Sequence, residues 1–207
     1  MLAVIDYGAG NLRSVLHALK HLGARDMQLV QNPDQLLGAT KIILPGVGAF
    51  GAGMAQMRAQ KLVAPLKAAL NAGIPYLGIC VGMQMLYEVG EEMGEHEGMC
   101  ILGGRVKRFP HFPDRKVPHM GWNRLNIRHE SGLLAGLDES SYAYFVHSFY
   151  CDPADDDTVI GSVDYGIEFA AIVQRDNIYG VQFHPEKSQS TGLRILSNFL
   201  RLQERQC

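Results

Sequence analysis

Cys80 lies in a sequence setting that is typical of a nucleophile. It is the centre of the segment 78–82, which reads Gly-Ile-Cys-Val-Gly, between an apolar run at 74–79 and an apolar pattern of helical spacing that starts at residue 82. A tight strand-to-helix turn of this kind is the sulfur counterpart of the G-x-S-x-G elbow, whose small neighbours leave the central side chain exposed at the end of a sheet. A cysteine held in this way could carry out acyl transfer.

His184 and Glu186 could supply the base and the orienting carboxylate that such a thiol needs. A free thiol has a pKa of about 8.5, so little thiolate is present at neutral pH unless a helix N-terminus or a nearby base favours it. His184 follows an apolar strand pattern at 178–183, and Pro185 keeps the backbone extended. Side chains two residues apart in an extended segment lie on one side, so Glu186 could bind one imidazole nitrogen while the other nitrogen faces Cys80.

Each of these motifs also has a plain structural interpretation, because His-Pro-Glu is often only a turn and G-x-C-x-G is often a packed turn of small residues. Their joint occurrence in one α/β chain favours a catalytic site. His17 and His21 share a helix face, but without a third ligand they predict a polar surface stripe, so we expect neither a metal site nor a cofactor. The 4 cysteines are scattered along the chain and predict reduced thiols rather than disulfides.

The segment 46–51 spells G-x-G-x-x-G, which is the fingerprint of dinucleotide-binding sites. That fingerprint also needs an acidic residue about twenty positions further on to bind a ribose hydroxyl, and no Asp or Glu occurs from Gln35 to Tyr87. The segment also follows the third expected strand rather than the first. The pattern therefore argues against a nucleotide site, and its glycines instead predict backbone amides that are free to point into a cleft.

The spacing of apolar residues predicts alternating strands and helices in the first half of the chain. The expected strands are 2–6, 27–31, 41–44 and 74–79, and the expected helices are 11–22, 53–70 and 82–89. Repeated βα units of this size predict a parallel sheet with helices on both faces. Its ligand site should lie at the carboxyl ends of the strands.

The second half of the chain has shorter and more closely spaced strand patterns. They lie at 100–108, 121–127, 142–151, 158–164, 168–174 and 178–183, and a helix is expected at 189–204. Asp176 and Asn177 predict a tight hairpin between the last two strands. We therefore predict an α/β fold with an open, mostly parallel central sheet that is flanked by helices and extended by antiparallel strands.

The composition is that of an ordinary globular protein, and we expect one domain over residues 1–207. Apolar residues make up 47% of the chain and charged residues 19%, and the net charge is −2 with no basic block. This charge pattern argues against nucleic acid and an anionic membrane surface as partners. No apolar run approaches the length of a membrane span, and Met1 leads straight into a strand pattern, so we expect a cytoplasmic protein.

Three segments together resemble the class I (triad) glutamine amidotransferases, whose fold is flavodoxin-like. They are Gly-Ile-Cys-Val-Gly-Met-Gln at 78–84, Pro-Gly-Val-Gly-Ala-Phe at 45–50 and His-Pro-Glu at 184–186. Within this class, Asp-Tyr-Gly-Ala-Gly-Asn-Leu-Arg-Ser at 6–14 and Pro-His-Met-Gly-Trp-Asn at 118–123 resemble the glutaminase subunits of imidazole glycerol phosphate synthases, enzymes of histidine biosynthesis. The resemblance runs the length of the chain.

The resemblance implies a glutaminase reaction at Cys80. The sulfur would attack the side-chain amide of glutamine, His184 would accept the thiol proton and later protonate the departing ammonia, and Glu186 would orient His184. Water would then hydrolyse the glutamyl thioester to glutamate. The backbone amides of Val47 and Val81 would form the oxyanion hole. The residues implied in binding glutamine are Gly46, Gly48, Gln84, His147, Ser148 and Phe149.

The resemblance also implies a partner protein. In this family the ammonia passes to a cyclase subunit, a (β/α)8 barrel that forms a heterodimer with the glutaminase. The cyclase uses the ammonia to make imidazole glycerol phosphate and an aminoimidazole carboxamide ribotide. We expect the docking surface around the cleft, at Asn11, Arg13, Met120, Trp122 and Lys187. Trp122 is the single tryptophan of the chain, and tryptophan is enriched at interface hot spots.

Other functions stay open on the sequence alone. A triad glutaminase could serve another acceptor, in pyridoxal phosphate, purine or chorismate metabolism. A γ-glutamyl hydrolase or a cysteine peptidase could share the fold, since fold does not determine function. A non-enzymatic binding subunit could bury Cys80 as an inert thiol. The direction in which the Val47 amide points does not follow from the sequence.

Overall fold

The computed structural model describes residues 1–8 and 11–202, and a 12-stranded sheet runs through these residues. Its central strands are parallel and lie in the order β2 (Met27–Val30), β1 (Leu2–Ile5), β3 (Lys41–Gly46), β4 (Tyr76–Cys80) and β14 (Ile178–Val181). Nearly every residue of β1, β3, β4 and β14 is buried, as expected of strands covered on both faces. The predicted parallel core is confirmed.

Antiparallel strands extend this core beyond β14. The next strand, β13 (Glu168–Arg175), pairs with β14 through a tight turn in which Asp176 has a φ of 55°, so the predicted hairpin is confirmed. The sheet continues through β11 (Phe149–Pro153), β7 (Gly104–Arg108), β5 (Val89–Gly90) and β6 (His96–Glu97), and β12 (Val159–Asp164) and β9 (Asn126–Ile127) branch from β13. The predicted α/β fold class is confirmed.

A separate two-stranded antiparallel sheet is formed by β8 (His119–Arg124) and β10 (Tyr142–His147). The sequence predicts one strand over 142–151, and this prediction is wrong because the chain bends at Ser148. Before the bend, β10 pairs with β8, whereas β11 after the bend joins the main sheet. The expected strands at 100–108 and 121–127 also differ, since β7 begins at Gly104 and β8 ends at Arg124.

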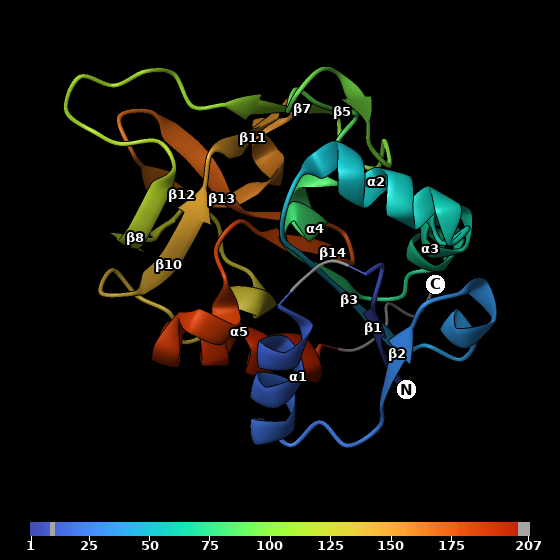
Figure 1. Ribbon diagram of the computed structural model, residues 1–207. Coiled ribbons are helices and arrows are strands. Elements are labelled where there is room, and N and C mark those ends of the chain that lie inside the picture. The colour runs from blue at the N-terminus through green and yellow to red at the C-terminus, as the bar shows by residue number, and fades with distance from the viewer. Residues whose placement is uncertain (9–10, 203–207) are drawn as a thin grey trace.

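Helices cover the parallel strands on both faces (Figure 1). The helices α1 (Leu12–His21) and α5 (Gln189–Arg201) lie on one side, α2 (Phe50–Ala59) and α3 (Val63–Asn71) lie on the other, and α4 (Val81–Gln84) follows β4. Short 3-10 turns lie at Pro33–Leu36, Gly132–Leu134, Asp156–Thr158 and Pro185–Lys187. Within residues 1–8 and 11–202, no helix has the length and apolar character needed to cross a membrane.

Three helix predictions are wrong in their extent. The helix expected over 53–70 is two helices, because the chain turns at Lys61, whose φ of 58° is not helical. The helix expected over 82–89 ends at Gln84, because the carbonyl groups of residues 85–88 accept hydrogen bonds from the amides of residues 98–102. The helix expected over 189–204 ends at Arg201, and residues 203 and 204 lie outside the described part of the chain.

Candidate active site

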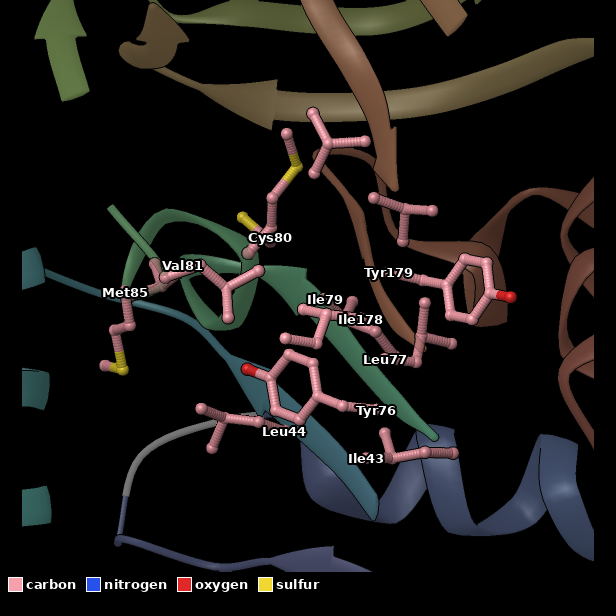
Figure 2. Close-up of a cluster of buried hydrophobic side chains, with 14 of the residues drawn as sticks. Ile43, Leu44, Tyr76, Leu77, Ile79, Cys80, Val81, Met85, Ile178 and Tyr179 are labelled. Atoms are coloured by element: carbon pink, nitrogen blue, oxygen red, sulfur yellow. The ribbon is translucent and has the colours of Figure 1, made fainter. Parts of the chain in front are cut away.

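Cys80 stands on a strained turn between β4 and α4 (Figure 2). Its backbone has a φ of 53° and a ψ of −110°. Such a conformation costs a non-glycine residue about 1–3 kcal/mol and is concentrated at functional sites. The flanking glycines allow close backbone contacts: a Cβ at Gly78 would lie 2.5 Å from the carbonyl oxygen of Gly82, and a Cβ at Gly82 would collide with the carbonyl oxygen of Leu44. These contacts explain why the turn needs its glycine spacing.

His184 and Glu186 lie together beside Cys80. Nδ1 of His184 is 3.0 Å from Oε1 of Glu186, and both side chains are buried. Burial lowers the pKa of His184, but hydrogen bonding and charge from Cys80 and Glu186 outweigh burial and raise the pKa to about 10. Because Glu186 occupies Nδ1, Nε2 is the nitrogen that can serve Cys80. The raised pKa leaves His184 protonated at neutral pH. An imidazolium beside a cysteine favours the thiolate form of that cysteine.

A cleft of about 470 Å³ opens beside Cys80. Its lining comes from the loop after β3 (Val47, Gly48, Ala49), the elbow (Cys80, Val81, Gln84), the bend at 146–149, and Glu92, Pro118, His184 and Lys187. Most residues expected to bind substrate are thus brought together around one cavity. Gly46 does not line it. It lies opposite Cys80 in the β3–β4 register, where a Cβ would come within 2.7 Å of the Gly82 amide nitrogen.

The two residues whose amides are expected to form an oxyanion hole both line the cleft. Val81 follows Cys80 directly, and Val47 begins the loop after β3. The backbone of Val47 also lies near the hydroxyl of Tyr7, a fully buried residue that does not line the cleft. Burial and the charge of Cys80 raise the pKa of Tyr7, and the nearby Val47 backbone opposes this rise. The Tyr7 hydroxyl has no hydrogen-bond partner among the described residues, so the Val47 amide is not committed to it.

Gln84 is held by hydrogen bonds within the protein. Its Nε2 donates to the carbonyl oxygen of Phe149 at 3.2 Å and to Oε1 of Gln182 at 3.1 Å. With both amide hydrogens used, only Oε1 of Gln84 could contact a ligand. Gln182 in turn donates from Nε2 to Sγ of Cys80 at 3.6 Å. Gln84, which is expected to bind glutamine, therefore also supports the surroundings of Cys80.

Sequence patterns do not single out three residues of this site: Tyr7, Glu92 and Gln182. Glu92 lines the cleft, and its Oε2 accepts a 2.8 Å hydrogen bond from the Phe50 amide at the start of α2. The sequence does not predict its place in the site, because the helix expected over 82–89 ends at Gln84 and the chain after it takes a different course. Gln182 carries a usable signal, since it lies two residues before His184 and so on the same side of an extended segment. For Tyr7, the sequence offers only its position just after the first strand.

Four of the five residues expected on a docking surface are exposed. Met120 and Trp122 of β8 are 62% and 48% exposed. The Trp122 ring lies 6.0 Å from the ring of Tyr144, and Nζ of Lys187 lies 6.0 Å from that same ring. Trp122, Tyr144 and Lys187 thus form a continuous surface, which we call the aromatic face, and Lys187 also lines the cleft.

The α1 side of the expected docking surface is separate from the cleft. Arg13 is exposed and lines a cavity of about 570 Å³ that also reaches Glu186. Asn11 is half-buried, and its side chain accepts a 2.8 Å hydrogen bond from Ser14. The structure therefore places the expected docking residues in two groups, on the aromatic face and at the start of α1.

Within residues 1–8 and 11–202, the thiol, carboxylate and histidine side chains do not gather into a metal centre. No cluster of three or more His, Cys, Asp or Glu side chains that could bind a metal is found in the part of the chain that the structure describes. Cys80, Cys100 and Cys151 are free thiols, as the spacing of the cysteines predicts. Cys207 lies outside the described residues.

Comparison with known proteins points to one family. The model of the family described as "Glutamine amidotransferase class-I" matches residues 3–202. The chain is 49% identical over 199 residues to the protein named imidazole glycerol phosphate synthase subunit HisH of Desulfitobacterium hafniense strain Y51, covering 96% of this chain and 93% of that protein. It is 46% identical over 202 residues to the protein of the same name from Methanothermobacter thermautotrophicus, covering 98% of each.

Solved structures share the fold at lower sequence identity. The chain resembles PurLQS from Thermotoga maritima with a TM-score of 0.73, 19% identity and coverage of 96% of each chain. It resembles the glutaminase domain of Trypanosoma brucei CTPS, solved with bound acivicin, with a TM-score of 0.69, 17% identity and coverage of 99% of this chain and 95% of that chain. These similarities concern the fold alone.

Proposed function

Because the chain belongs to the class I glutamine amidotransferases, we infer that it is the glutaminase subunit of an imidazole glycerol phosphate synthase. In this role it hydrolyses glutamine to glutamate and ammonia for a reaction of histidine biosynthesis. The observation that carries the assignment is its identity of 49% to a relative of that name over 96% of the chain. The enzyme class and function predicted from the sequence are confirmed.

We propose that the Cys80 thiolate attacks the side-chain amide carbon of glutamine. A C–S bond forms, and the carbonyl electron pair moves onto oxygen. The His184 imidazolium, oriented by Glu186, gives its Nε2 proton to the amide nitrogen as the C–N bond breaks, which releases ammonia and leaves a γ-glutamyl thioester. Neutral His184 then takes a proton from water as the water oxygen attacks the thioester carbon. Collapse of that intermediate expels the Cys80 thiolate and leaves His184 protonated, as it began.

The oxyanion of both steps needs donors that are already in place. The position of Val81 directly after Cys80 supports its amide as one donor. The Val47 amide would be the second donor, since Val47 lines the cleft beside Gly48. Loss of one such donor lowers the rate by roughly 10²–10³. The rate of glutamine hydrolysis should therefore depend on whether the Val47 N–H points into the cleft.

The cleft offers suitable partners for both ends of glutamine. Glu92 is the one acidic side chain among the described residues that line the cleft, which supports it as the partner of the α-ammonium group. The bend at His147, Ser148 and Phe149 would hold the α-carboxylate, together with Gly48. Oε1 of Gln84 remains as a further acceptor.

We further propose that the partner is a cyclase with a (β/α)8 barrel and that it docks on the aromatic face, Met120, Asn11 and Arg13. Two observations support this surface: Met120 and Trp122 are large, exposed apolar side chains beside the cleft, and the relatives are named as subunits. Ammonia released at Cys80 would then enter the partner directly. A cytoplasmic location is in keeping with the free thiols of Cys80, Cys100 and Cys151.

Labelled glutamine tests the assignment, with the chain alone and with the candidate cyclase and its ribotide substrate. We expect weak hydrolysis by the chain alone and strong hydrolysis with the liganded cyclase. Glutamine use that does not change when the cyclase is added would point to a different acceptor. Cleavage of peptides or γ-glutamyl chains would point to a hydrolase of another kind.

The variant Cys80→Ala separates chemistry from docking. The complex that contains it should lose glutamine-dependent synthesis but keep synthesis from free ammonium. Loss of both activities would show that Cys80 acts in folding or assembly, and retention of glutamine use would remove it as the nucleophile. Cys100→Ala, at an exposed thiol, is the matched control and should keep both activities.

A further inference from the structure

Gln182 is a buried polar residue that the triad mechanism leaves without a role. It lies just after β14, its side chain is fully buried, and its Nε2 is 3.6 Å from Sγ of Cys80. An apolar side chain would fill this place without needing a polar partner. The side chain instead presents an amide group to the one sulfur that has to change its charge during the reaction.

The orientation of this amide group is fixed by its neighbours. Oε1 of Gln182 accepts from Nε2 of Gln84, and the same Nε2 donates to the carbonyl oxygen of Phe149. If the Gln84 amide were reversed, its oxygen would face two other oxygens. Gln84 must therefore donate to Oε1 of Gln182, and Gln182 must present its N–H groups to Cys80.

The Phe149 carbonyl is itself held by a pair of buried histidines. Nδ1 of His147 lies 2.7 Å from this oxygen, and because a carbonyl only accepts, Nδ1 carries the proton. Burial lowers the pKa of His147 to about 3 and that of His119 to about 4, so both rings are neutral at neutral pH. Nε2 of a neutral His147 is then an acceptor, and it lies 3.1 Å from Nδ1 of His119, which must donate.

These bonds make one chain that begins on β8, the strand that carries Met120 and Trp122, and ends at the nucleophile. Its members are His119, His147, the Phe149 carbonyl, Gln84, Gln182 and Sγ of Cys80. At each of the hydrogen bonds named above, the neighbouring atoms fix which group donates and which accepts. A buried network satisfied in this way holds its members rigidly.

We propose that Gln182 is a further catalytic residue, whose side-chain N–H stabilises negative charge on Sγ of Cys80, and that Gln84 is the positioning residue that aims it. The proposal rests on the proposed function. The N–H would act when the C–S bond breaks in the second step and the electron pair returns to sulfur. It also acts in the resting enzyme, where a hydrogen bond to the charged form of a group favours that form.

Alkylation of Cys80 tests this role without any need for glutamine or the cyclase. We would measure the rate of iodoacetamide modification of the Cys80 peptide by mass spectrometry from pH 5 to pH 10, in the full chain. Gln182→Met removes the donor while keeping the size of the side chain. The pH at which the rate is half-maximal should rise by about one unit, as expected for loss of one hydrogen bond to a charged group, and the rate below that pH should fall about tenfold.

Three more variants keep the result interpretable. Gln182→Glu has the shape of glutamine, but an ionised carboxylate can only accept, so the rate should fall further than in Gln182→Met. Gln84→Met removes the orienting bond and should shift the pH profile in the same direction by a smaller amount. Gln174→Met, on the neighbouring strand β13, is the matched control and should keep the profile of the unaltered chain.

The outcomes distinguish this proposal from the proposed function. Unchanged alkylation profiles in Gln182→Met and Gln182→Glu would overturn the role of Gln182, even in an active glutaminase. Shifted profiles in a chain that does not hydrolyse glutamine would support the role of Gln182 and overturn the glutaminase assignment. If Gln182→Met does not fold, as judged by circular dichroism, the profiles of Gln182→Glu and Gln84→Met decide the question.

Discussion

His119 and His147 form a buried pair in which Nδ1 of the first ring lies 3.1 Å from Nε2 of the second. The His119 ring is stacked between Phe145 and Tyr165, with ring centroids 4.8 Å and 3.9 Å away. Aromatic rings therefore surround two imidazole groups, each of which would gain a proton in mild acid if it were exposed to water. The fold keeps both neutral.

This pair should make the protein sensitive to acid. The pKa of His147 is about 3 and that of His119 is about 4 in the folded state, against about 6.5 for an exposed histidine. Between about pH 4 and pH 6.5 the unfolded state binds more protons at these two histidines than the folded state does. The free energy of unfolding therefore falls as the pH drops below about 6.5. His184 opposes this effect near neutral pH, because its raised pKa keeps it protonated in the folded state while the unfolded state loses that proton above about pH 6.5. Below about pH 5.5 it is protonated in both states and adds no slope.

Urea unfolding at pH 7 and pH 5 measures this effect. His147 alone should reduce the free energy of unfolding by about 1–2 kcal/mol between these pH values. His147→Gln should be less stable at pH 7 but should lose less stability on acidification. His17→Gln, on the exposed face of α1, is the control and should leave the slope unchanged. An equal pH dependence in the unaltered chain and in His147→Gln would contradict this account.

Gly82 should be the residue of the elbow that tolerates substitution least. A Cβ there would collide with the backbone carbonyl of Leu44 in β3, and backbone cannot rotate away as a side chain could. We expect Gly82→Ala to lose about 2–4 kcal/mol of stability and glutaminase activity with it. Gly103→Ala is the matched control, since its Cβ would meet only the Ala154 side chain at 3.4 Å. Equal unfolding midpoints for the two variants would show that the elbow can relax.

Tyr7→Phe tests the cost of a buried hydroxyl near the loop after β3. The Tyr7 hydroxyl is buried and has no hydrogen-bond partner among the described residues. Removing an unsatisfied hydroxyl while keeping the ring should leave the free energy of unfolding unchanged or raise it by about 1 kcal/mol. Urea unfolding of the two chains measures the difference. A loss of more than about 1 kcal/mol would show that the hydroxyl makes a hydrogen bond, for example with the Val47 amide.

Sequence patterns predicted the parts of this site that depend on spacing along one element. Glycines on both sides of Cys80 indicate a tight turn, and the two-residue step from His184 to Glu186 puts both side chains on one face. Both follow from local geometry. Gln182 lies two residues before His184 and so on the same face, but a glutamine does not by its residue type indicate a catalytic role. That role becomes visible only from its distance to the Cys80 sulfur.

Other features depend on contacts between distant segments and could not be predicted in this way. The helix after Cys80 ends at Gln84 because the amides of residues 98–102 bind the carbonyl groups of residues 85–88. The bend at Ser148 separates two strands that read as one apolar pattern. The direction of the Val47 amide is a property of one peptide group, which leaves apolar spacing unchanged, so no sequence pattern reveals it.

Glu186→Gln should separate the orientation of His184 from its charge. Glutamine keeps an oxygen near Nδ1 of His184, but it removes the negative charge that helps to raise the pKa of His184 to about 10. We expect glutamine-dependent turnover to fall by at least about a hundredfold, with ammonium-dependent synthesis by the complex unchanged. The pKa of His184, followed by NMR of its ring nitrogens, should fall below its value in the unaltered chain. Since Oε2 of Glu186 has no hydrogen-bond partner among the described residues, the variant breaks no other bond, and the loss of stability near neutral pH should be limited to the lost ion pair with protonated His184. A large loss of turnover with no change in the titration of His184 would show that geometry, rather than charge, is the contribution of Glu186.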